Sequence, residues 1–380
     1  MSEKKLSKKK IFIFSSVHFW NDTRIFYKEA QSLVKKYEVE LHAPADFKFR
    51  DINGIRIYGL PKWKRVADRR KIRKEIWKRI RKSNADIYHF HDPELIWIGI
   101  KAKILLKKRL VYDVHEHYPR AILDKQWIPL IFRRPVSVVF NIFEFICGRF
   151  FDGVIFTTRI IGKRFSLKKS ICINNYPLMI DFKNDSQCEK KNQIIYVGGI
   201  SKIRGFAELI KAFQLVTSEH YPNLKLVVIG KYFEEQFEKE VNELISNLKI
   251  GEKIKFLHYL PYLQIMPFIA QSKIGIVTYL PYSNNVVCLP NKLFEYMVCG
   301  TAVLASDFEL YREVVEYAQC GLVVDPTNPD EIAKNMVIML SDVDKLKSMG
   351  KNGRGAVLKK YNWKFEEEKL LDFYKKLLKE

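Results

Sequence analysis

A turn rich in glycine and cations follows a strand-like run in the second half of the chain. The stretch "GGISKIRGFAELIKAF" (198–213) begins with Gly198 and Gly199, which allow a tight turn and a close approach of the backbone. Lys202 and Arg204 then precede an amphipathic helical pattern. Free N–H groups, the helix dipole and two cations together favour an anion. We therefore expect a phosphate here, although an ordinary strand–helix turn can also contain two glycines.

A second possible anion site lies in "LPNKLFEYMVCG" (289–300). Pro290 suits the first turn of a helix, where its missing N–H costs nothing. The helix would then direct three N–H groups toward a ligand, those of Asn291, Lys292 and Leu293. Glu295 lies one turn further along. A partly buried carboxylate needs a partner, and either a pair of ribose hydroxyls or a neighbouring lysine would supply one.

Histidines and carboxylates follow strand-like runs in the first half of the chain. His89 and His91 in "HFHDPEL" are two residues apart, so they share one face of a strand, with His91 at its tip. Other candidates for contact with a second substrate follow the neighbouring runs, namely His18, Asp22, His115 and Glu116. A histidine at a strand tip is as often structural as catalytic, and His18, Asp22 and Arg24 would equally serve to order their loop.

Short apolar runs alternate with helix-length segments along the chain. The strand-like runs are 10–16, 37–44, 55–61, 87–93, 109–116, 153–158, 194–200, 224–230, 254–260, 274–280, 302–307 and 321–326. Apolar strands separated by helices are typical of parallel sheets covered on both faces. They predict an α/β protein with two doubly wound, Rossmann-like domains facing a cleft. Ligands bind outside the carboxyl ends of such strands, where the candidate residues lie.

The domain boundary is expected within "KSICINNYPLMIDFKNDSQCEKKN" (169–192), a turn followed by a polar stretch. We therefore predict an N-terminal domain at 1–175 and a C-terminal, ligand-binding domain at 176–360. A final amphipathic helix at about 361–380 can pack on either domain.

Composition limits the class of protein. The 380 residues, 47% of them hydrophobic, suffice for two cores. A net charge of +23 favours anionic partners, unless it reflects only a lysine-rich proteome. The six cysteines have no metal-type spacing, so we expect reduced, mostly buried thiols in a cytosolic protein. The charged N-terminus suggests no signal peptide, and the apolar stretch 135–156 is interrupted by charges, as in a buried helix followed by a strand.

Several motifs together resemble the retaining glycosyltransferases of family 4, which have the GT-B fold. In the second half these are the glycine turn, "PNKLFEYMVCGTAVLASD" and "EVVEYAQCGLVVDPTNPDEIA". In the first half, "HFHDPEL" and "YDVHEHYP" fit one branch of the family. The resemblance implies that Glu295 holds the nucleotide ribose and Arg204 contacts the donor diphosphate. It also implies that His91 lies near the transferred sugar and the acceptor, which makes these three the expected catalytic residues.

The sequence departs from the family pattern at two positions. The first glutamate of the family's Glu-x7-Glu motif would fall at position 287, which is Val287 here. Gly199 stands where the family often has an arginine, and Lys202 or Lys292 can supply the missing charge. We therefore expect the donor site to comprise Gly198, Gly199, Lys202, Arg204, Asn291, Lys292, Leu293 and Glu295.

A strongly basic segment spans 62–82, "KWKRVADRRKIRKEIWKRIRK", with twelve Lys or Arg and two acidic residues. Its isoleucines Ile72, Ile76 and Ile80 form one helical stripe that can dock on the first domain. The charged face then lies in water or on anionic lipid, and relatives with lipid-linked acceptors use such a face. No nucleic-acid-binding motif is present, so we expect no nucleic-acid partner.

The resemblance implies transfer of a sugar, with retention, from a UDP- or GDP-sugar to a lipid-linked cell-surface glycan. It also implies front-face attack, in which a diphosphate oxygen takes the acceptor's proton, without a metal or other cofactor. We expect a cytoplasmic enzyme of polysaccharide biosynthesis, peripherally associated with the inner face of the cell membrane. Two alternatives remain open at this stage. One is a nucleotide-sugar 2-epimerase of the same fold, and the other is a non-catalytic membrane- or RNA-binding protein.

Overall fold

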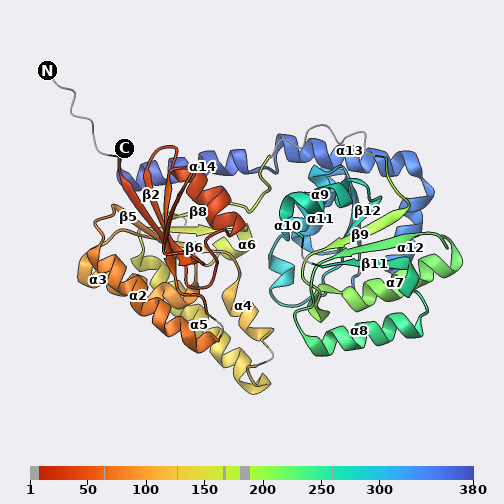
Figure 1. Cartoon of the computed structure of the whole chain (residues 1–380), viewed down its shortest axis with the longest axis horizontal. Helices are drawn as coiled ribbons and strands as arrows, with labels where there is room; N and C mark the ends of the chain where they lie inside the picture. The colour runs from red at the N-terminus through yellow and green to blue at the C-terminus, as the bar shows by residue number, and fades with distance from the viewer. Residues whose placement is uncertain (1–7, 64, 126, 166–167, 180–188, 259) are drawn as a thin grey trace. The chain divides into compact units, whose positions relative to one another are not determined.

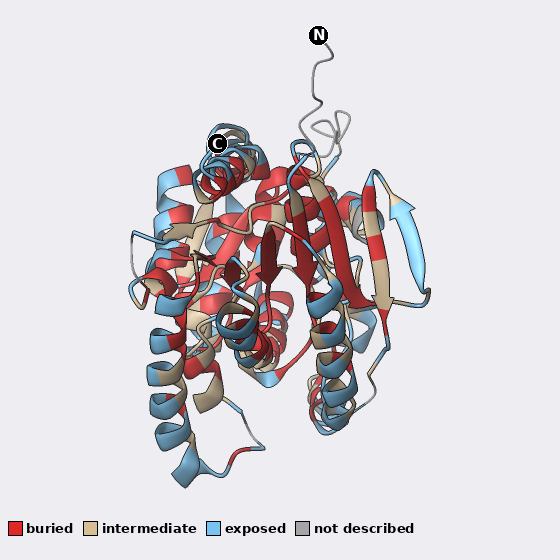
Figure 2. Ribbon diagram, turned by 90° about the vertical axis from the view of Figure 1, so that its left-hand side faces the viewer, coloured by how far each residue is buried: buried red, intermediate tan, exposed pale blue. Residues whose placement is uncertain are grey.

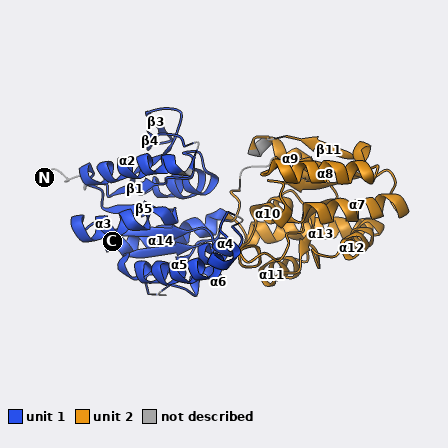
Figure 3. Ribbon diagram, turned by 90° about the horizontal axis from the view of Figure 1, so that it is seen from below, with its two compact units in different colours: residues 1–175, 363–380 blue, residues 176–362 orange. Residues whose placement is uncertain are grey.

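The computed structural model describes residues 8–63, 65–125, 127–165, 168–179, 189–258 and 260–380. The chain divides into two compact units, which Figure 3 shows in two colours. Unit 1 comprises residues 1–175 and 363–380, and unit 2 comprises residues 176–362. The last helix therefore belongs to unit 1. Residues 180–188, within the stretch where the boundary is expected, lie outside the described residues.

Unit 1 contains an eight-stranded sheet in the order β3-β4-β2-β1-β5-β6-β7-β8, in which only β3 and β4 are antiparallel. The strands are β1 (Lys10–Phe14), β2 (Glu38–Pro44), β3 (Phe49–Ile52), β4 (Ile55–Leu60), β5 (Ile87–Phe90), β6 (Leu110–Val114), β7 (Gly153–Phe156) and β8 (Ser170–Cys172). The prediction missed β3, although its hairpin has an Asn-Gly signal. Asn53 and Gly54 both adopt positive φ, as a two-residue hairpin turn requires.

Helices cover both faces of this sheet (Figure 1). On one side lie the π-helix η1 (Thr23–Ala30), the short α1 (Gln31–Leu33) that continues it, and α14 (Trp363–Leu378), which contacts both. On the other side lie α2 (Arg69–Lys82), α3 (Ile96–Leu106) and α5 (Leu130–Phe150). The shorter helices are η2 (Val66–Asp68), η3 (Pro93–Leu95), α4 (Tyr118–Leu123) and α6 (Arg159–Gly162).

Unit 2 contains a six-stranded, fully parallel sheet in the order β11-β10-β9-β12-β13-β14. The strands are β9 (Gln193–Val197), β10 (Lys225–Ile229), β11 (Ile254–Leu257), β12 (Ile274–Val277), β13 (Ala302–Ser306) and β14 (Gly321–Val324). The helices are η5 (Lys202–Arg204), α7 (Phe206–Glu219), α8 (Glu235–Asn247), η6 (Gly251–Lys253), α9 (Tyr262–Ala270), η7 (Asn285–Val287), α10 (Asn291–Val298), α11 (Glu309–Ala318), α12 (Pro329–Ser341) and α13 (Val343–Lys359). The predicted α/β class with two parallel-sheet domains is confirmed.

Three expectations about local structure are wrong. The basic helix α2 begins at Arg69 rather than at 62, although its stripe Ile72, Ile76 and Ile80 is buried as expected. The apolar stretch 135–156 does contain a helix followed by a strand, but most of the large apolar side chains of α5 are exposed. Of the five cysteines described, only Cys147 and Cys320 are buried. Cys188 lies outside the described residues.

Burial follows the layers of the fold, and Figure 2 shows the central strands as buried and the outward sides of the helices as exposed. No helix in the described part of the chain combines the length and the apolar character needed to cross a bilayer.

Candidate functional site

The glycine turn of unit 2 follows β9 and requires glycine at two of its positions. Gly198 has φ +112°, a conformation that residues with a Cβ rarely adopt. Gly205 has φ +67°, and a Cβ there would stand 1.9 Å from the carbonyl oxygen of Thr278. The turn is therefore held closely against β12 and its following loop. Gly205 caps α7, which begins at Phe206.

Two cations from different elements converge on this turn. A guanidinium N–H of Arg204 donates to the carbonyl oxygen of Gly199 at 3.1 Å. The Nζ of Lys292, at the start of α10, lies 3.8 Å from the ring centre of Tyr196 and 5.1 Å from that of Tyr279. A Cβ on Gly198 would touch both cationic side chains, at 3.5 Å each.

Lys292 is buried, and no described atom forms a hydrogen bond with its Nζ. Burial lowers the pKa of Lys292 well below its ordinary value, and the charge of Arg204 lowers it further, while Glu295 opposes the shift. A buried ammonium without a hydrogen-bond partner is electrostatically unfavourable. The arrangement favours an anion that would bridge Lys292 and Arg204.

The other predicted donor-site residues fall into two groups. Lys202 and Asn291 are exposed, and Glu295 is half-buried one helical turn from Lys292. Leu293 is fully buried, and its N–H donates to the carbonyl oxygen of Pro290 at 3.2 Å. The expectation that this N–H points at a ligand is therefore wrong, because Pro290 is the N-cap rather than part of the first turn. Its carbonyl is thus available to the third residue of α10.

The sequence reasoning missed the residues that shape this site from β9 and from the segment after β12. The hydroxyl of Tyr196 donates to the carbonyl oxygen of Gly199 at 2.9 Å. The side-chain amide of Asn285 donates to the carbonyl oxygens of Ile203 and Leu280, at 2.8 and 3.0 Å. Tyr196 directly precedes the turn in "IIYVGG", so its place on the strand was a usable signal. For Asn285 only the tertiary structure shows the contact.

Unit 1 holds a fully buried cluster of polar side chains at the carboxyl ends of β5 and β6. Its members are Glu29 from η1, His89 and His91 from β5 and its tip, and Asp113 from β6. The Nε2 atoms of His89 and His91 lie 3.9 and 3.7 Å from Oε2 of Glu29. Tyr374 of α14 closes the cluster with a 2.7 Å hydrogen bond to Nδ1 of His89.

Arg24 provides the positive charge of this cluster. It binds both carboxylate oxygens of Asp113, at 3.0 and 3.1 Å, and its Nε lies 2.9 Å from Oε1 of Glu29. Arg24 is thus an interior residue of unit 1. Burial raises the pKa of Glu29 well above its usual range, and the charge of Asp113 adds to this. The charge of Arg24, followed by that of His115, overcomes burial and keeps the pKa of Asp113 well below its usual range.

The same four side chains could also hold a metal ion, since each offers a ligand atom and these atoms lie within 4.8 Å of one another. Arg24 already pairs with Asp113, however, and the raised pKa of Glu29 favours its neutral form. Burial is the main cause that lowers the pKa of His91 to about 4, so its imidazole is neutral at neutral pH. The guanidinium of Arg24 thus already offsets the carboxylate charge of Asp113 in this cluster.

The predicted second-substrate residues come together beside this cluster, but His91 is not at the surface. Nδ1 of His91 lies 3.0 Å from Nε2 of His115, and the ring of His115 lies 5.3 Å from that of His18. His91 is fully buried, whereas His18 and His115 are half-buried and Glu116 is exposed. The expectation that His91 itself stands at the open edge is therefore wrong, because its side chain is fully buried and contacts the half-buried His115.

Asp92 orders the loop that carries His18 and Asp22. Its buried carboxylate accepts hydrogen bonds from the hydroxyl of Ser15 at 2.8 Å and from the N–H of Val17 at 3.1 Å. Nδ1 of His18 in turn lies 3.1 Å from the carboxylate of Asp22, which also caps η1. Both members of this His–Asp pair thus have roles in loop structure.

The His18–Asp22 pair should stabilise the protein in a defined pH range. Burial alone would lower the pKa of His18, but the hydrogen bond to Asp22 and the nearby acidic charges raise it to about 9. A raised folded-state pKa adds stability that is complete below the unfolded value of about 6.5 and is lost as pH rises through 9. We expect His18→Gln to lower the free energy of unfolding by about 1 kcal/mol near pH 6 and by almost nothing above pH 9.

The measurement is thermal or urea unfolding of both proteins across this pH range. His220→Gln, at an exposed histidine, serves as the control. A deficit in His18→Gln that stays constant up to pH 10 would show that packing, rather than charge, explains the loss.

Comparison with known proteins identifies the family of the chain. The model of the glycosyl transferases group 1 matches residues 180–356, and the model of glycosyltransferase family 4 matches residues 23–167. The two matches together span most of the chain, and only β1 and β8 among the described strands lie outside them. The chain belongs to the family 4 glycosyltransferases.

Individual relatives of this glycosyltransferase are distant. An α-1,4-N-acetyl-D-galactosaminyltransferase of Campylobacter jejuni is 23% identical over 90% of this chain and 92% of its own length. An uncharacterised glycosyltransferase of Methanocaldococcus jannaschii is 25% identical over 52% of this chain. That alignment, and those with a second protein of the same archaeon and with spore coat protein SA of Bacillus subtilis, span about half of each relative's length.

Solved structures share the GT-B fold with this glycosyltransferase. Sucrose-phosphate synthase from Thermosynechococcus elongatus has a TM-score of 0.77 at 16% identity, covering 97% of this chain and 99% of its own. Anabaena HepE, solved in complex with UDP, has a TM-score of 0.73 at 15% identity, covering 97% and 100%.

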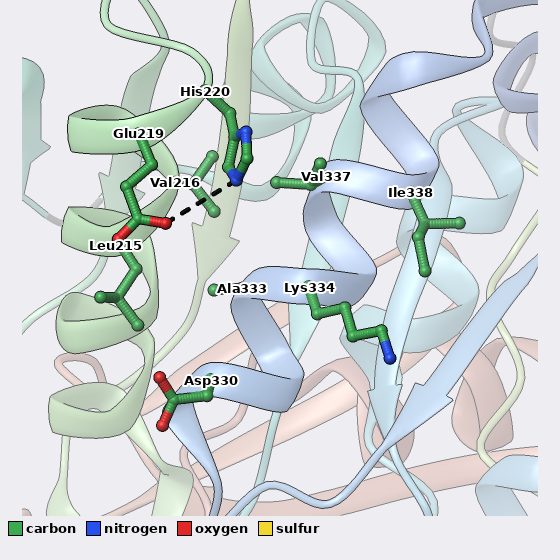
Figure 4. Close-up of a pocket in the computed structure, with 9 residues that line it drawn as sticks. All are labelled: Leu215, Val216, Glu219, His220, Asp330, Ala333, Lys334, Val337 and Ile338. Carbon is green, nitrogen blue, oxygen red and sulfur yellow. Dashed lines mark ion pairs between the residues drawn. The ribbon is translucent and has the colours of Figure 1, made fainter.

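At the position of the family's first motif glutamate, the glycosyltransferase has a buried Val287 at the end of η7. This position therefore offers no carboxylate to a sugar. A separate pocket of about 250 Å³ lies between α7 and α12, lined by residues that include His220, Asp330 and Lys334 (Figure 4). It is at the C-terminal end of α7, roughly 20 Å along a 14-residue helix from the glycine turn, so it belongs to another surface.

Proposed function

We propose that this glycosyltransferase moves a sugar, with retention at the anomeric carbon, from a nucleotide-diphosphate donor to a lipid-linked glycan. The observation that carries the donor assignment is the buried ammonium of Lys292, which has no hydrogen-bond partner among the described residues and adjoins Arg204 and the glycine turn. A diphosphate would accept the hydrogen bonds that the buried ammonium no longer makes to water. Its negative charge would lie between the positive charges of Lys292 and Arg204.

In this proposal different residues of unit 2 bind successive parts of the donor. Glu295, one turn from Lys292, would accept hydrogen bonds from the ribose hydroxyls. Lys292 and Arg204 would stabilise the negative charge that develops on the leaving diphosphate, which is the main task in a transfer of this type. Their two charges would do this without a metal ion.

Retention would follow from attack on the same face as the leaving group, with a diphosphate oxygen taking the acceptor's proton. This route needs no carboxylate nucleophile. His18 and His115, two half-buried histidines of unit 1, would orient the acceptor hydroxyl, with His91 holding His115 in place.

Two known proteins support the choice of substrates. Anabaena HepE was solved with UDP and with UDP-glucose. The Campylobacter jejuni relative is named for a GalNAc-containing, diphospho-undecaprenol-linked substrate. We therefore propose UDP as the first donor base to test, a lipid-linked acceptor, and a place on the cytoplasmic side of an anionic membrane reached through the basic segment 62–82.

The test begins with a thermal-shift panel of UDP-, GDP- and ADP-sugars. A ligand that binds only the folded state should raise the melting temperature, and at 100 times its Kd it adds about 2.7 kcal/mol of stability. We expect one nucleotide class to do so, with the shift reduced in Glu295→Ala. The absence of a shift with every donor would contradict the proposal.

Radiolabelled donor then separates transfer from epimerisation. With the lipid-linked acceptor present, label should move to the lipid fraction. Without acceptor, a transferase leaves the donor nearly unchanged, whereas a 2-epimerase converts it. Conversion of the sugar without acceptor would replace the proposed activity by epimerisation.

A further inference from the structure

Helix α5 carries an extensive apolar surface that is exposed. Ten of its large hydrophobic side chains are more than 40% exposed, namely Leu130, Ile131, Phe132, Val136, Val138, Val139, Ile142, Phe145, Ile146 and Phe150. Trp127, just before the helix, is 79% exposed. Single exposed hydrophobic residues are ordinary, but a contiguous patch of this kind marks an interaction site.

The inward side of α5 explains why its apolar side faces out. Ser137, Glu144, Cys147 and Gly148 are the buried residues of the helix. The hydroxyl of Ser137 donates to the carbonyl oxygen of Pro119 at 2.6 Å, and Glu144 pairs with Arg164 and with the hydroxyl of Tyr112. These contacts fix the rotation of α5 about its axis, so the apolar stripe cannot turn inward without removing Glu144 from Arg164 and Tyr112.

Neighbouring helices extend this surface and give it charge. Helix α3 lies between α2 and α5 and contacts both (Figures 1 and 3). It exposes Trp97, Ile104 and Leu105. Helix α2 exposes a row of cations, namely Arg70, Lys71, Lys74, Lys78, Arg81 and Lys82. We call the outward sides of α2, α3 and α5 the membrane face of unit 1.

We propose that α5 inserts its apolar side into the boundary between headgroups and acyl chains of an anionic bilayer, with α2 over the lipid headgroups. This inference rests on the proposed function, because a lipid-linked acceptor would bring the enzyme to a membrane. It extends the membrane contact from the basic segment 62–82 to a separate apolar helix, α5. An amphipathic helix with a large apolar face and flanking cations lies in the plane of the interface. With 21 residues, α5 would cover about 32 Å of membrane surface.

A second copy of the chain fits this surface less well than a bilayer does. The apolar residues of α5 are flanked by exposed Arg134 and Arg149. A two-fold contact places the same patch on both partners, so it would bring these cations and the row on α2 near their own copies. Anionic lipid headgroups are instead complementary to these charges.

The experiment measures partition of the full chain between buffer and vesicles. The vesicles are phosphatidylcholine alone, or with about one third phosphatidylglycerol to supply the negative surface potential. The test variant is Val139→Glu with Ile146→Glu, and both positions are exposed, so the fold should be retained. The matched control is Val343→Glu with Leu358→Glu, at exposed apolar positions of α13 in unit 2.

We expect the wild type to bind the anionic vesicles and to remain partly bound at high salt, which removes charge contacts but not inserted side chains. The α5 variant should lower the partition coefficient at least about tenfold, because each buried CH₂ adds to membrane affinity. The control variant should bind as the wild type does. Lys74→Glu with Lys78→Glu should weaken binding at low salt and change the high-salt fraction little.

Two results would overturn the inference. The first is unchanged vesicle binding by the α5 variant. The second is a wild-type dimer in light scattering that the α5 variant converts to monomer, since a second copy would then cover the face. Donor thermal shifts, run in parallel, should be equal for wild type and α5 variant. If no donor binds the wild type, the proposed function fails while the vesicle result stands on its own.

Discussion

Lys292→Met is expected to lower kcat for sugar transfer about 10²- to 10³-fold, the effect of removing one group that stabilises charge in a transition state. The reason is the position of its Nζ beside Arg204 at the glycine turn. The measurement is kcat with saturating donor. Lys202→Met, at an exposed cation of the same turn, is the matched control and should lose much less.

The same substitution should make the protein without ligand more stable. Methionine fills a similar volume without a buried ammonium, so the free energy of unfolding should rise by about 1–3 kcal/mol at neutral pH. Because the pKa of Lys292 is lowered in the folded state, the unfolded chain binds more protons between the two pKa values, and wild-type stability rises with pH there. The advantage of Lys292→Met should therefore shrink and vanish above about pH 10.4.

These two measurements together distinguish a binding role from a structural one. A structural lysine would lose stability and activity in parallel on replacement. Full activity of Lys292→Met would remove this residue from the donor site. A loss of stability would show that the aromatic contacts of Lys292 with Tyr196 and Tyr279 outweigh the cost of its burial.

Arg24→Met is expected to lower the free energy of unfolding of unit 1 by about 3–5 kcal/mol, the usual cost of removing one partner from a buried ion pair. Arg24 holds Asp113 through two hydrogen bonds and also pairs with Glu29, and all three side chains are buried. The loss corresponds to about 2–4 °C of melting temperature per kcal/mol for a unit of this size. Differential scanning calorimetry would record it.

Two further variants test whether the unpaired charge of Asp113 causes the loss of stability. Lys35→Met breaks an exposed ion pair with Glu367 in the same unit, and should change stability by less than about 1 kcal/mol. Adding Asp113→Asn to Arg24→Met removes the unpaired charge and should restore part of the loss. If the double variant is no more stable than Arg24→Met alone, the cost comes from lost packing around the guanidinium and not from an unpaired carboxylate.

The sequence by itself determined the architecture and named most residues of one candidate site. Apolar runs that alternate with helices specify parallel sheets, because each strand must be covered on both faces. The glycine turn, Arg204 and Lys292 could be named from the sequence, because a tight turn requires glycine and a site for an anion requires nearby cations. The pairing of Lys292 with Tyr196 needed the register of β9 and α10, which no local pattern contains.

Tertiary structure alone decided the buried cluster and the outward face of α5. Glu29 lies next to Arg24 because η1 is a π-helix, in which residues five positions apart are neighbours on the helix surface. In an α-helix the same two side chains would point in different directions. Tyr374 reaches His89 across 285 positions of the chain, a contact set only by the return of α14 to unit 1. In α5, hydrophobicity suggested burial, but the partners of Ser137 and Glu144 lie on the protein side of the helix. Where hydrogen-bonding groups have fixed partners inside, the apolar residues of the same helix are left facing out.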